Sequence, residues 1–228
     1  MNSNSYLEAL VNYNKALTQR NNLLKYFFEN RRWDAEMIEP WNVKMAPLAV
    51  KIAEARRDFV QKFTPVFNDV YKEISGGAEE VSFEYSTSVD GTVEDFASQL
   101  ERAEENDRRL RRSTVGVHKD DLVFKIKEYP LKKFGSQGQQ KTYLVALRLA
   151  QLAFLEDATG VKPILLLDDI FDKIDEKRVE ALMRRVTDGS FGQVFITDTH
   201  LGRIPEMFKE TGAEVKVFEV NKGEVELV

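Results

Sequence analysis

Short apolar runs alternate with longer helical patterns after residue 112, and this alternation restricts the fold more than any other feature of the sequence. The strand-like runs cover residues 122–126, 164–167, 194–197 and 215–220, and helical patterns begin at Gln137 and Glu176. Strands that alternate with helices are typical of an α/β layer with a largely parallel sheet. We therefore predict that residues 113–228 form one α/β lobe.

The first part of the chain has a different pattern, because its apolar positions follow helical spacing. The apolar positions from residue 5 to about residue 30 that recur every three or four residues are Leu7, Leu10, Leu17, Leu24 and Phe28. This spacing places them on one helical stripe, which Asn14 and Asn21 interrupt. Polar residues in such a stripe can fix the register of packed helices. Two interpretations stay open: a helical hairpin or short coiled-coil-like arm, and an ordinary amphipathic helix.

A proline and a glycine pair divide the rest of this helical part. A second helical run begins near Trp33, and Pro65 predicts a break or kink in it. After the glycine pair at 76–77, residues 81–86 alternate between apolar and polar side chains, as in a half-buried strand. Helical character then returns from residue 93 to residue 112. We therefore predict a mainly helical lobe at residues 1–112 beside the α/β lobe.

Charge and composition exclude several classes of protein. The net charge of −5 argues against a free-standing nucleic-acid-binding module, which usually carries a basic footprint. The chain has no cysteine, so disulfides and thiolate metal sites are excluded. No stretch approaches the ~20 apolar residues of a membrane span, and the first residues lack the pattern of a signal peptide. A cytoplasmic location is the simplest expectation.

The segment GSQGQQKT at residues 135–142 precedes a helix that is apolar nearly all the way round. The N-terminus of a buried helix presents unpaired N–H groups and the positive end of the helix dipole, which suit a phosphate. Ser136 adds a hydroxyl donor, and Gly138 lets the backbone approach an anion closely. A glycine-bearing turn that only caps a buried helix is the commoner meaning of such a segment taken alone.

Two adjacent aspartates, Asp168 and Asp169, end the apolar run at residues 164–167. Ligands of open α/β sheets bind at the carboxyl ends of the strands. In nucleotide hydrolysis Asp168 would hold Mg²⁺, and Asp169 would orient and deprotonate the attacking water. A solvated acidic turn after a core strand is the alternative. The order of glycine turn, buried helix and acidic strand end favours the nucleotide site.

These motifs together resemble one family. GSQGQQKT followed by LLLDDIFDKID resembles the signature loop and Walker B strand of ABC-type ATPases, and in particular the RecF family of recombination mediators, which are relatives of SMC proteins. TVGVHKDD at residues 114–121 is similar to a further segment of that family, although Val117 and Lys119 stand where the family has proline and arginine. The resemblance implies the C-terminal half of an ABC/SMC-like ATPase lobe, with a mostly parallel sheet and helices, beside a mainly helical lobe with a short arm.

The resemblance also implies site residues, cofactors and partners. The nucleotide-binding residues that it implies are Ser136, Gln137, Gly138, Gln139, Asp172 and Asp175. The first four would complete a site on the P-loop of a second subunit, and the two aspartates lie in a loop that communicates across the dimer. The implied cofactors are ATP and Mg²⁺. The implied activity is an ATP-dependent homodimer that binds DNA at single-strand gaps and duplex junctions and supports RecA loading with RecR and RecO.

The sequence departs from the family in one respect, because the phosphate-cradling pattern G-x-x-x-x-G-K-[ST] occurs nowhere in it. The family places that loop at the start of the protein. We therefore expect the chain to be a C-terminal portion or a separately encoded half, and we predict that it hydrolyses ATP negligibly by itself. Two alternatives stay open: half of another SMC- or ABC-like chromosome-associated ATPase, and a non-enzymatic binding module that keeps the motifs as relics.

Two histidines and an arginine tract each have two interpretations. His200 follows a predicted strand, where it could act as a γ-phosphate switch or lie in a loop without such a role. His118 is interpreted as a structural histidine in preference to a metal ligand or catalytic group. Arg108, Arg111 and Arg112 share a face if the tract is helical, and they could contact the phosphate backbone of DNA. Ion pairs with the neighbouring glutamates would instead make the tract an ordinary solvent-facing helix.

Overall fold

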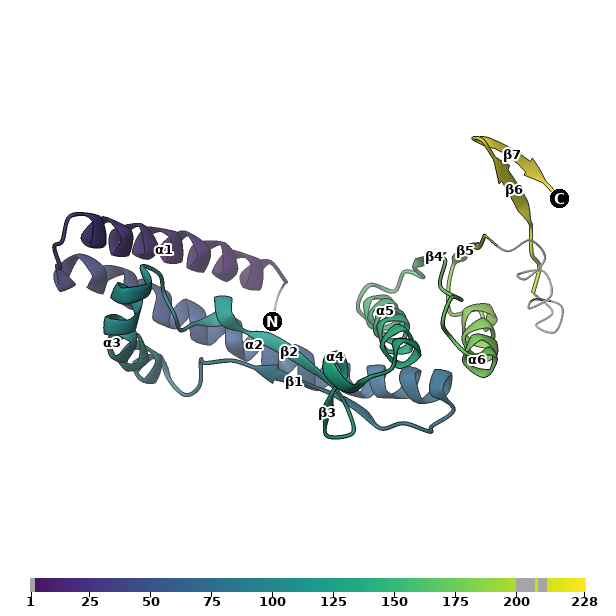
Figure 1. The fold of residues 1–228 in the computed structure, drawn as a ribbon, viewed down its shortest axis with the longest axis horizontal. Helices are drawn as coiled ribbons and strands as arrows, with labels where there is room; N and C mark the ends of the chain where they lie inside the picture. Colours follow the sequence, from purple (N-terminus) through teal and green to yellow (C-terminus); the bar gives the residue numbers. More distant parts are fainter. Residues whose placement is uncertain (1–2, 200–207, 209–212) are drawn as a thin grey trace. The chain divides into compact units, whose positions relative to one another are not determined.

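The computed structural model describes residues 3–199, 208 and 213–228, and the chain divides into two compact units (Figure 1). Unit 1 comprises residues 1–62 and 83–123, and unit 2 comprises residues 63–82 and 124–228. The lobe boundary near residue 113 stays a prediction, because compactness alone does not locate a functional boundary.

The elements follow the alternation expected from the sequence. In chain order they are α1 (Ser3–Glu29), α2 (Ala35–Ser75), β1 (Val81–Ser86), α3 (Val93–Leu110), the 3-10 helix η1 (Val117–Lys119), β2 (Asp121–Ile126), β3 (Tyr129–Pro130), α4 (Leu131–Phe134), α5 (Gln137–Thr159), β4 (Ile164–Asp168), α6 (Glu176–Thr187), β5 (Gln193–Thr197), β6 (Phe218–Asn221) and β7 (Glu224–Leu227). None of these described helices is both long and apolar enough to cross a membrane.

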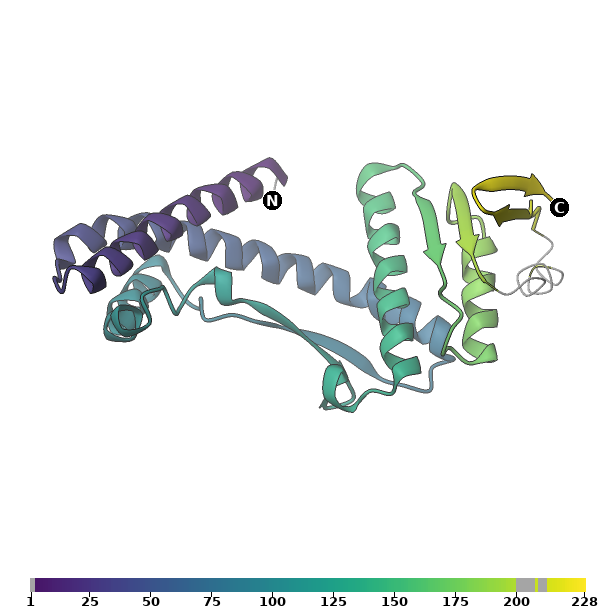
Figure 2. The ribbon, with the colours of Figure 1, turned by 45° about the horizontal axis from the view of Figure 1, so that its top comes forward.

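The strands form three small sheets. Strands β1, β2 and β3 make one sheet in that order, and β6 and β7 form an antiparallel hairpin. Strand β4 pairs with β5 in parallel, with Leu166 opposite Phe195. Figure 2 shows β4 and β5 side by side, with α5 and α6 next to them. The predicted α/β class with parallel strand pairing is therefore confirmed.

Unit 1 has its core where α1 packs against α2 and α3. The buried positions of α1 are Ala9, Tyr13, Ala16, Arg20, Leu24 and Phe27. The predicted stripe is partly wrong, since Leu7 is 58% and Phe28 is 53% exposed. Small side chains of both helices, Ala9 and Ala16 on α1 and Ala49 on α2, belong to one buried cluster. Of the two interpretations left open, the helical hairpin is the one observed (Figures 1 and 2).

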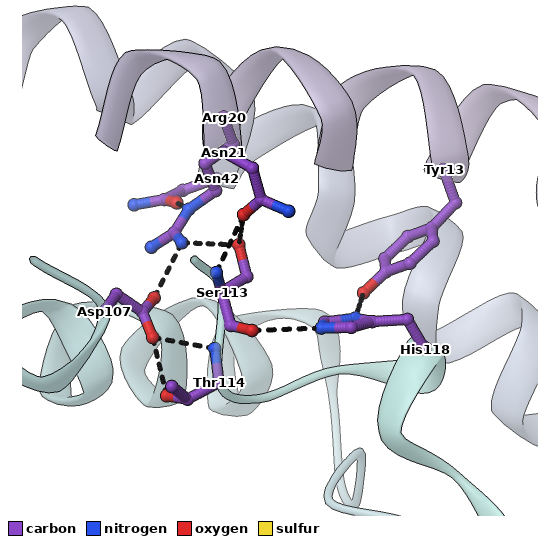
Figure 3. Close-up of polar contacts among 8 residues, drawn as sticks. All are labelled: Tyr13, Arg20, Asn21, Asn42, Asp107, Ser113, Thr114 and His118. Atoms are coloured by element: carbon purple, nitrogen blue, oxygen red, sulfur yellow. Dashed lines mark hydrogen bonds and ion pairs between the residues drawn. The ribbon is translucent and has the colours of Figure 1, made fainter. Parts of the chain in front are cut away.

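A fully buried arginine, Arg20, joins α1 to α2 and to the chain after α3 (Figure 3). Its guanidinium donates to Asp107 at 2.6 Å, to Ser113 at 2.7 Å and to Asn42 at 2.8 Å. The second carboxylate oxygen of Asp107 accepts from the backbone N–H and the hydroxyl of Thr114, at 2.7 and 2.5 Å. Buried charges persist only where they are paired and hydrogen-bonded. This network therefore fixes the three helices of unit 1 against the segment that follows α3.

His118 is held beside this network by both of its ring nitrogens (Figure 3). Its Nε2 lies 3.2 Å from the carbonyl oxygen of Ser113, and its Nδ1 lies 2.9 Å from the hydroxyl of Tyr13. A carbonyl can only accept, so Nε2 carries the proton and Nδ1 accepts from Tyr13. Burial lowers the pKa of His118, although the bond to the Ser113 carbonyl acts in the opposite direction. These contacts agree with the structural interpretation of this histidine.

Replacing His118 with glutamine should flatten the pH dependence of stability. Because the folded pKa of His118 lies below its ordinary value of 6.5, the unfolded chain takes up a proton first as the pH falls. The free energy of unfolding then decreases below about pH 6.5, by at most about 1.4 kcal/mol per pH unit and less where solvent reaches the ring. Urea unfolding at about pH 7, 6 and 5 would measure this. Equal slopes for both proteins would contradict it.

Unit 2 has an aromatic core that includes the last part of α2. Phe67 and Tyr71 of α2 are fully buried, and their rings lie 4.7 and 5.7 Å from the ring of Tyr143 in α5. Burial of two such side chains contributes about 3–6 kcal/mol, which offsets the ~3 kcal/mol that a proline costs inside a helix. Helix α2 accordingly continues through Pro65 to Ser75. Of the break or kink predicted at Pro65, the break is therefore wrong.

Candidate nucleotide-binding site

The glycine turn begins helix α5 with a capping box. Ser136 is the N-cap residue, its hydroxyl oxygen accepts from the N–H of Gln139 at 3.2 Å, and its own N–H donates to the Gln139 side chain at 2.8 Å. The hydroxyl hydrogen of Ser136 takes no part in this box. The backbone N–H groups of Gln137 and Gly138 have no intrahelical partner, because they lie in the first turn. The turn therefore presents three donors at the positive end of the helix dipole, where an anion binds favourably.

The acidic strand end lies at the carboxyl edge of β4. Asp168 is in register with Thr197 of β5, and the Thr197 hydroxyl donates to one oxygen of the Asp168 carboxylate. Asp169 turns the chain out of the strand with a φ of 45°, and its N–H donates to the Thr197 carbonyl at 3.3 Å. Both aspartates are exposed. Thr197 was not among the predicted site residues, although its place at the end of the neighbouring parallel strand could have indicated it.

The glycine turn and the loop after β4 touch each other within unit 2. The ammonium group of Lys141, in the first turns of α5, donates to the backbone carbonyl of Asp169 at 2.9 Å. A Cβ atom at Gly138 would lie 3.0 Å from the backbone carbonyl of Lys173. Only a residue without a side chain fits this approach comfortably. The predicted phosphate-binding turn and the loop that carries the predicted acidic residues are therefore neighbours.

The acidic loop ends at Asp175, which caps helix α6. One oxygen of Asp175 accepts from the N–H of Arg178 at 3.1 Å, and the other lies 3.0 Å from Nε of the same arginine. Both oxygens are thus engaged within the chain. Asp172 is exposed and lies 4.0 Å from Lys173. The side chains of Asp172 and Asp175 are 61% and 60% exposed, so the two differ in their partners and not in their access to solvent. Their predicted roles in nucleotide binding stay predictions.

Arg178 and Glu79 join these parts, and the sequence interpretation missed both. Arg178 donates to Glu79 at 3.0 Å and to the Thr142 hydroxyl at 3.1 Å, in addition to its contacts with Asp175. Glu79 also accepts from the Gln139 side chain at 2.7 Å and from the Tyr71 hydroxyl. The side chains of Arg178 and Glu79 are only 16% and 13% exposed. This ion pair therefore connects the glycine turn to the acidic loop.

The charge of Glu79 is stabilised by its donors. Burial alone would raise the pKa of Glu79, but the hydrogen bonds donated by Tyr71, Gln139 and Arg178 together outweigh burial and lower it. One signal in the sequence could have revealed the pair. A basic residue in the first turn of a helix opposes the helix dipole, so Arg178 needed a carboxylate partner. Its partner Glu79 lies in a loop far away in the sequence, which is why no local pattern identifies it.

The other predicted residues are His200 and the three arginines near the end of α3. His200 falls outside the described residues. Helix α3 ends at Leu110, and Arg111 adopts a left-handed conformation with a φ of 56°. The expectation that Arg108, Arg111 and Arg112 share a helical face is therefore wrong, because the last two follow the helix. A role for these arginines in DNA binding stays a prediction.

Comparison with known proteins places the chain among curated relatives, although no protein-family model matches it. It is 43% identical over 214 residues to the DNA replication and repair protein RecF of Flavobacterium johnsoniae, which covers 94% of this chain and 59% of that protein. RecF of Phocaeicola vulgatus is 44% identical over 222 residues, covering 96% of this chain and 58% of that protein. The chain thus spans a little under three fifths of the length of these relatives.

A solved structure supports the same relationship. The structure of the recombination mediator protein RecF with ATP, from the RecFOR pathway, matches 99% of this chain and 59% of its own chain. Its TM-score is 0.79, and its sequence identity is 28%. The match in sequence and the match in structure both cover nearly all of this chain. The chain therefore belongs to the RecF family and corresponds to the C-terminal part of a RecF protein.

Proposed function

We propose that this chain supplies the signature-loop and magnesium-binding side of an ATP site in a RecF-type recombination mediator. The observation that carries this proposal is the contact between the glycine turn and the acidic loop, where Gly138 lies against the Lys173 carbonyl and Lys141 reaches the Asp169 carbonyl. The solved RecF relative is described with ATP, which supports ATP as the nucleotide.

Each group of the proposed site has a distinct task. Asp168 would hold Mg²⁺, which proteins commonly bind through one or two carboxylates together with phosphate oxygens and water. Asp169 would orient the attacking water. The Ser136 hydroxyl and the N–H groups of Gln137 and Gly138 would bind the γ-phosphate of ATP held by a second subunit.

The sheets of unit 2 support a requirement for further polypeptide. In β4 and β5, Leu165 and Leu167 are buried, whereas Ile164, Leu166 and Phe195 on the opposite face are 59%, 72% and 54% exposed. Parallel sheets occur almost only with both faces covered. The hairpin β6–β7 also has an exposed apolar face. Its members are Phe218, Val220, Val225 and Leu227. A P-loop-bearing polypeptide that covers these faces would complete both the fold and the ATP site.

The wider activity follows from the family relationship. We propose that the complete protein forms an ATP-dependent homodimer, binds DNA at single-strand gaps and duplex junctions, and supports RecA loading with RecR and RecO. The name of the solved relative, a recombination mediator of the RecFOR pathway, supports this role. A cytoplasmic location belongs to the same proposal.

Reconstitution with a P-loop polypeptide tests the proposed site. The chain would be mixed with the remaining part of the Flavobacterium johnsoniae RecF protein, and ATP turnover would be measured with and without Mg²⁺. We expect negligible turnover by the chain alone and magnesium-dependent turnover that approaches about 1 s⁻¹ in the mixture. Asp169→Asn in the mixture is expected to slow turnover by roughly 10²-fold or more, because it removes the base that positions water.

Two results would contradict the proposal. Turnover near 1 s⁻¹ by the isolated chain would show that it does not depend on a P-loop partner. A mixture that forms a stable complex but stays inactive would favour the alternative of a binding module with relic motifs. Size-exclusion chromatography of the mixture separates this outcome from a failure of the two polypeptides to associate.

A further inference from the structure

An arginine patch lies where α1 meets α2 and α3 ends in unit 1. Its members are Arg31, Arg108, Arg109, Arg111 and Arg112, all of them exposed. Among the residues that the structure describes, none of the five has a carboxylate within ion-pairing distance. Glu101, Glu104 and Glu105 do not pair with them, and Asp107 turns inward to Arg20. The ion-paired solvent-facing helix considered from the sequence is therefore not what is observed.

Aromatic rings hold two of these arginines in place without neutralising them. The guanidinium carbon of Arg108 lies 4.3 Å from the ring centre of Trp33, and that of Arg111 lies 4.4 Å from the ring centre of Phe28. Cation–π stacking keeps the positive charge available, whereas a carboxylate partner would cancel it. Stacking also restricts the side chains before any ligand arrives, which reduces the entropy lost on binding. Phe28 lies in the last turn of α1, Trp33 lies between α1 and α2, and the arginines lie at the end of α3.

Two arginines of the patch have a left-handed backbone conformation and lie just after the ends of α1 and α3. Arg31 follows α1 with a φ of 49°, and Arg111 follows α3 with a φ of 56°, so both helices end here. The negative ends of two helix dipoles favour cations, which explains one or two basic residues near them. Five exposed arginines are more than the one or two that the helix dipoles explain, and they occur in a chain whose net charge is −5. A local concentration of positive charge on an acidic protein indicates an anionic partner.

We infer that the arginine patch binds the phosphate backbone of DNA. Planar guanidinium groups bind phosphates through paired hydrogen bonds, and several side by side fit a polymer that repeats its phosphate at short intervals. This inference rests on the proposed function for the identity of the polymer and adds the place where it binds. Contacts of this kind position the DNA and do not read its sequence.

A charge-neutralising variant tests the patch in the 228-residue chain, alone and in the reconstituted mixture with ATP. Arg108→Gln, Arg111→Gln and Arg112→Gln would be combined, and the matched control would combine Arg102→Gln, Lys44→Gln and Lys62→Gln, which remove the same charge from exposed positions outside the patch. Fluorescence anisotropy would measure binding to an oligo-dT of about 30 nucleotides and to a duplex of about 30 base pairs, between about 25 and 200 mM salt. The two probes distinguish single-stranded from duplex DNA.

The patch variant is expected to bind roughly tenfold more weakly at low salt, and its plot of log affinity against log salt should be shallower by about 2. Phe28→Leu should weaken binding by a smaller factor, since it removes the stacking partner of Arg111 and leaves every charge in place. Because Phe28 is half exposed, this variant should fold normally. Circular dichroism would verify the fold of each variant.

Several outcomes would overturn the inference. They are an absence of DNA binding by the unmodified chain at the lowest salt, both alone and in the reconstituted mixture with ATP, an equal loss in the patch and control variants, and an unchanged salt dependence in the patch variant. An unchanged affinity for DNA would leave an acidic protein surface as the partner. The patch residues are not part of the proposed ATP site, so ATP turnover of the reconstituted mixture measured without DNA should be equal for the patch variant and the unmodified chain. A failure here would therefore be distinct from a failure of the proposed ATP site.

Discussion

Asp107→Ala is expected to lower the free energy of unfolding by about 3–5 kcal/mol, because it leaves the buried guanidinium of Arg20 without its counter-charge. The substitution also removes the acceptor that holds the N–H and hydroxyl of Thr114. Both side chains of the ion pair are fully inaccessible to solvent, so water cannot replace the lost carboxylate. Urea unfolding followed by far-ultraviolet circular dichroism would measure the change.

An exposed ion pair of the same unit provides the control. Asp58 and Lys62 lie one helical turn apart at 2.8 Å and are 50% and 61% exposed, so Asp58→Ala should change stability by less than about 1 kcal/mol. The combination of Asp107→Leu with Arg20→Met should regain part of the stability, since neither charge is then buried. A cost for Asp107→Ala no larger than that for Asp58→Ala would show that the network does not stabilise unit 1.

Glu79→Ala is expected to loosen the glycine turn and the acidic loop together. It removes the acceptor shared by Gln139, Arg178 and Tyr71, and at this partly buried site we expect a loss of about 2–3 kcal/mol. Hydrogen exchange should quicken both in residues 136–142 and in residues 169–178, because each segment is tied to Glu79 through one of these side chains. Mass spectrometry of peptides from the two segments would measure the exchange.

Glu73 offers a matched control, because it also lies near the end of α2 and faces an arginine of α6. Its distance to Arg185 is 3.8 Å, and its side chain is 45% exposed. Glu73→Ala should therefore leave exchange in the glycine turn unchanged. Faster exchange confined to the residues around position 79 in Glu79→Ala would contradict a connection between the two segments.

The pH dependence of Glu79→Gln gives a second readout of the same pair. Because the folded pKa of Glu79 lies below its ordinary value of 4.5, the charged form contributes stability above that value. This contribution is lost as the pH falls through the folded pKa. The difference in unfolding free energy between the two proteins should therefore narrow below about pH 4.5. A difference that stays constant across this range would show that the charge of Glu79 does not matter.

Much of the fold could be predicted because apolar runs and glycines indicate strands and helix starts from the local sequence alone. Strands β2, β4 and β5 and the starts of α5 and α6 lie within one residue of their predicted places. The buried face of α1 could not be found in the same way, because a charged residue, Arg20, lies in it. Its partner Asp107 is remote in sequence, so only the folded chain shows that the charge is satisfied.

The hairpin β6–β7 was missed for a different reason. Residues 215–220 were expected to form one strand, whereas the chain turns at Lys222 and Gly223, whose φ angles are 49° and 90°. Two positive φ angles in a two-residue loop are the geometry of a tight hairpin turn. The lysine–glycine pair between two apolar alternations is the local signal for this hairpin in the sequence.

The glycine turn and the acidic strand end of the candidate site could be predicted from the sequence, but the side chains that connect them could not. Ser136, Gly138 and Asp168 were identified from a turn, a helix start and a strand end, all of which are local patterns. The groups that join them, Glu79, Arg178 and Thr197, come from distant parts of the sequence and act through side-chain contacts. Long-range polar contacts leave no periodic trace in a sequence, so they become visible only in three dimensions.

The bare apolar side of β4 and β5 affects how the chain behaves in a cell. An uncovered apolar face associates readily with other exposed apolar surfaces, and copies of this protein are the nearest candidates. Newly synthesised molecules therefore either assemble with the P-loop-bearing polypeptide or aggregate with one another. Synthesis of the P-loop-bearing polypeptide at the same time and place would favour assembly. Overproduction of this chain alone should instead yield insoluble aggregates.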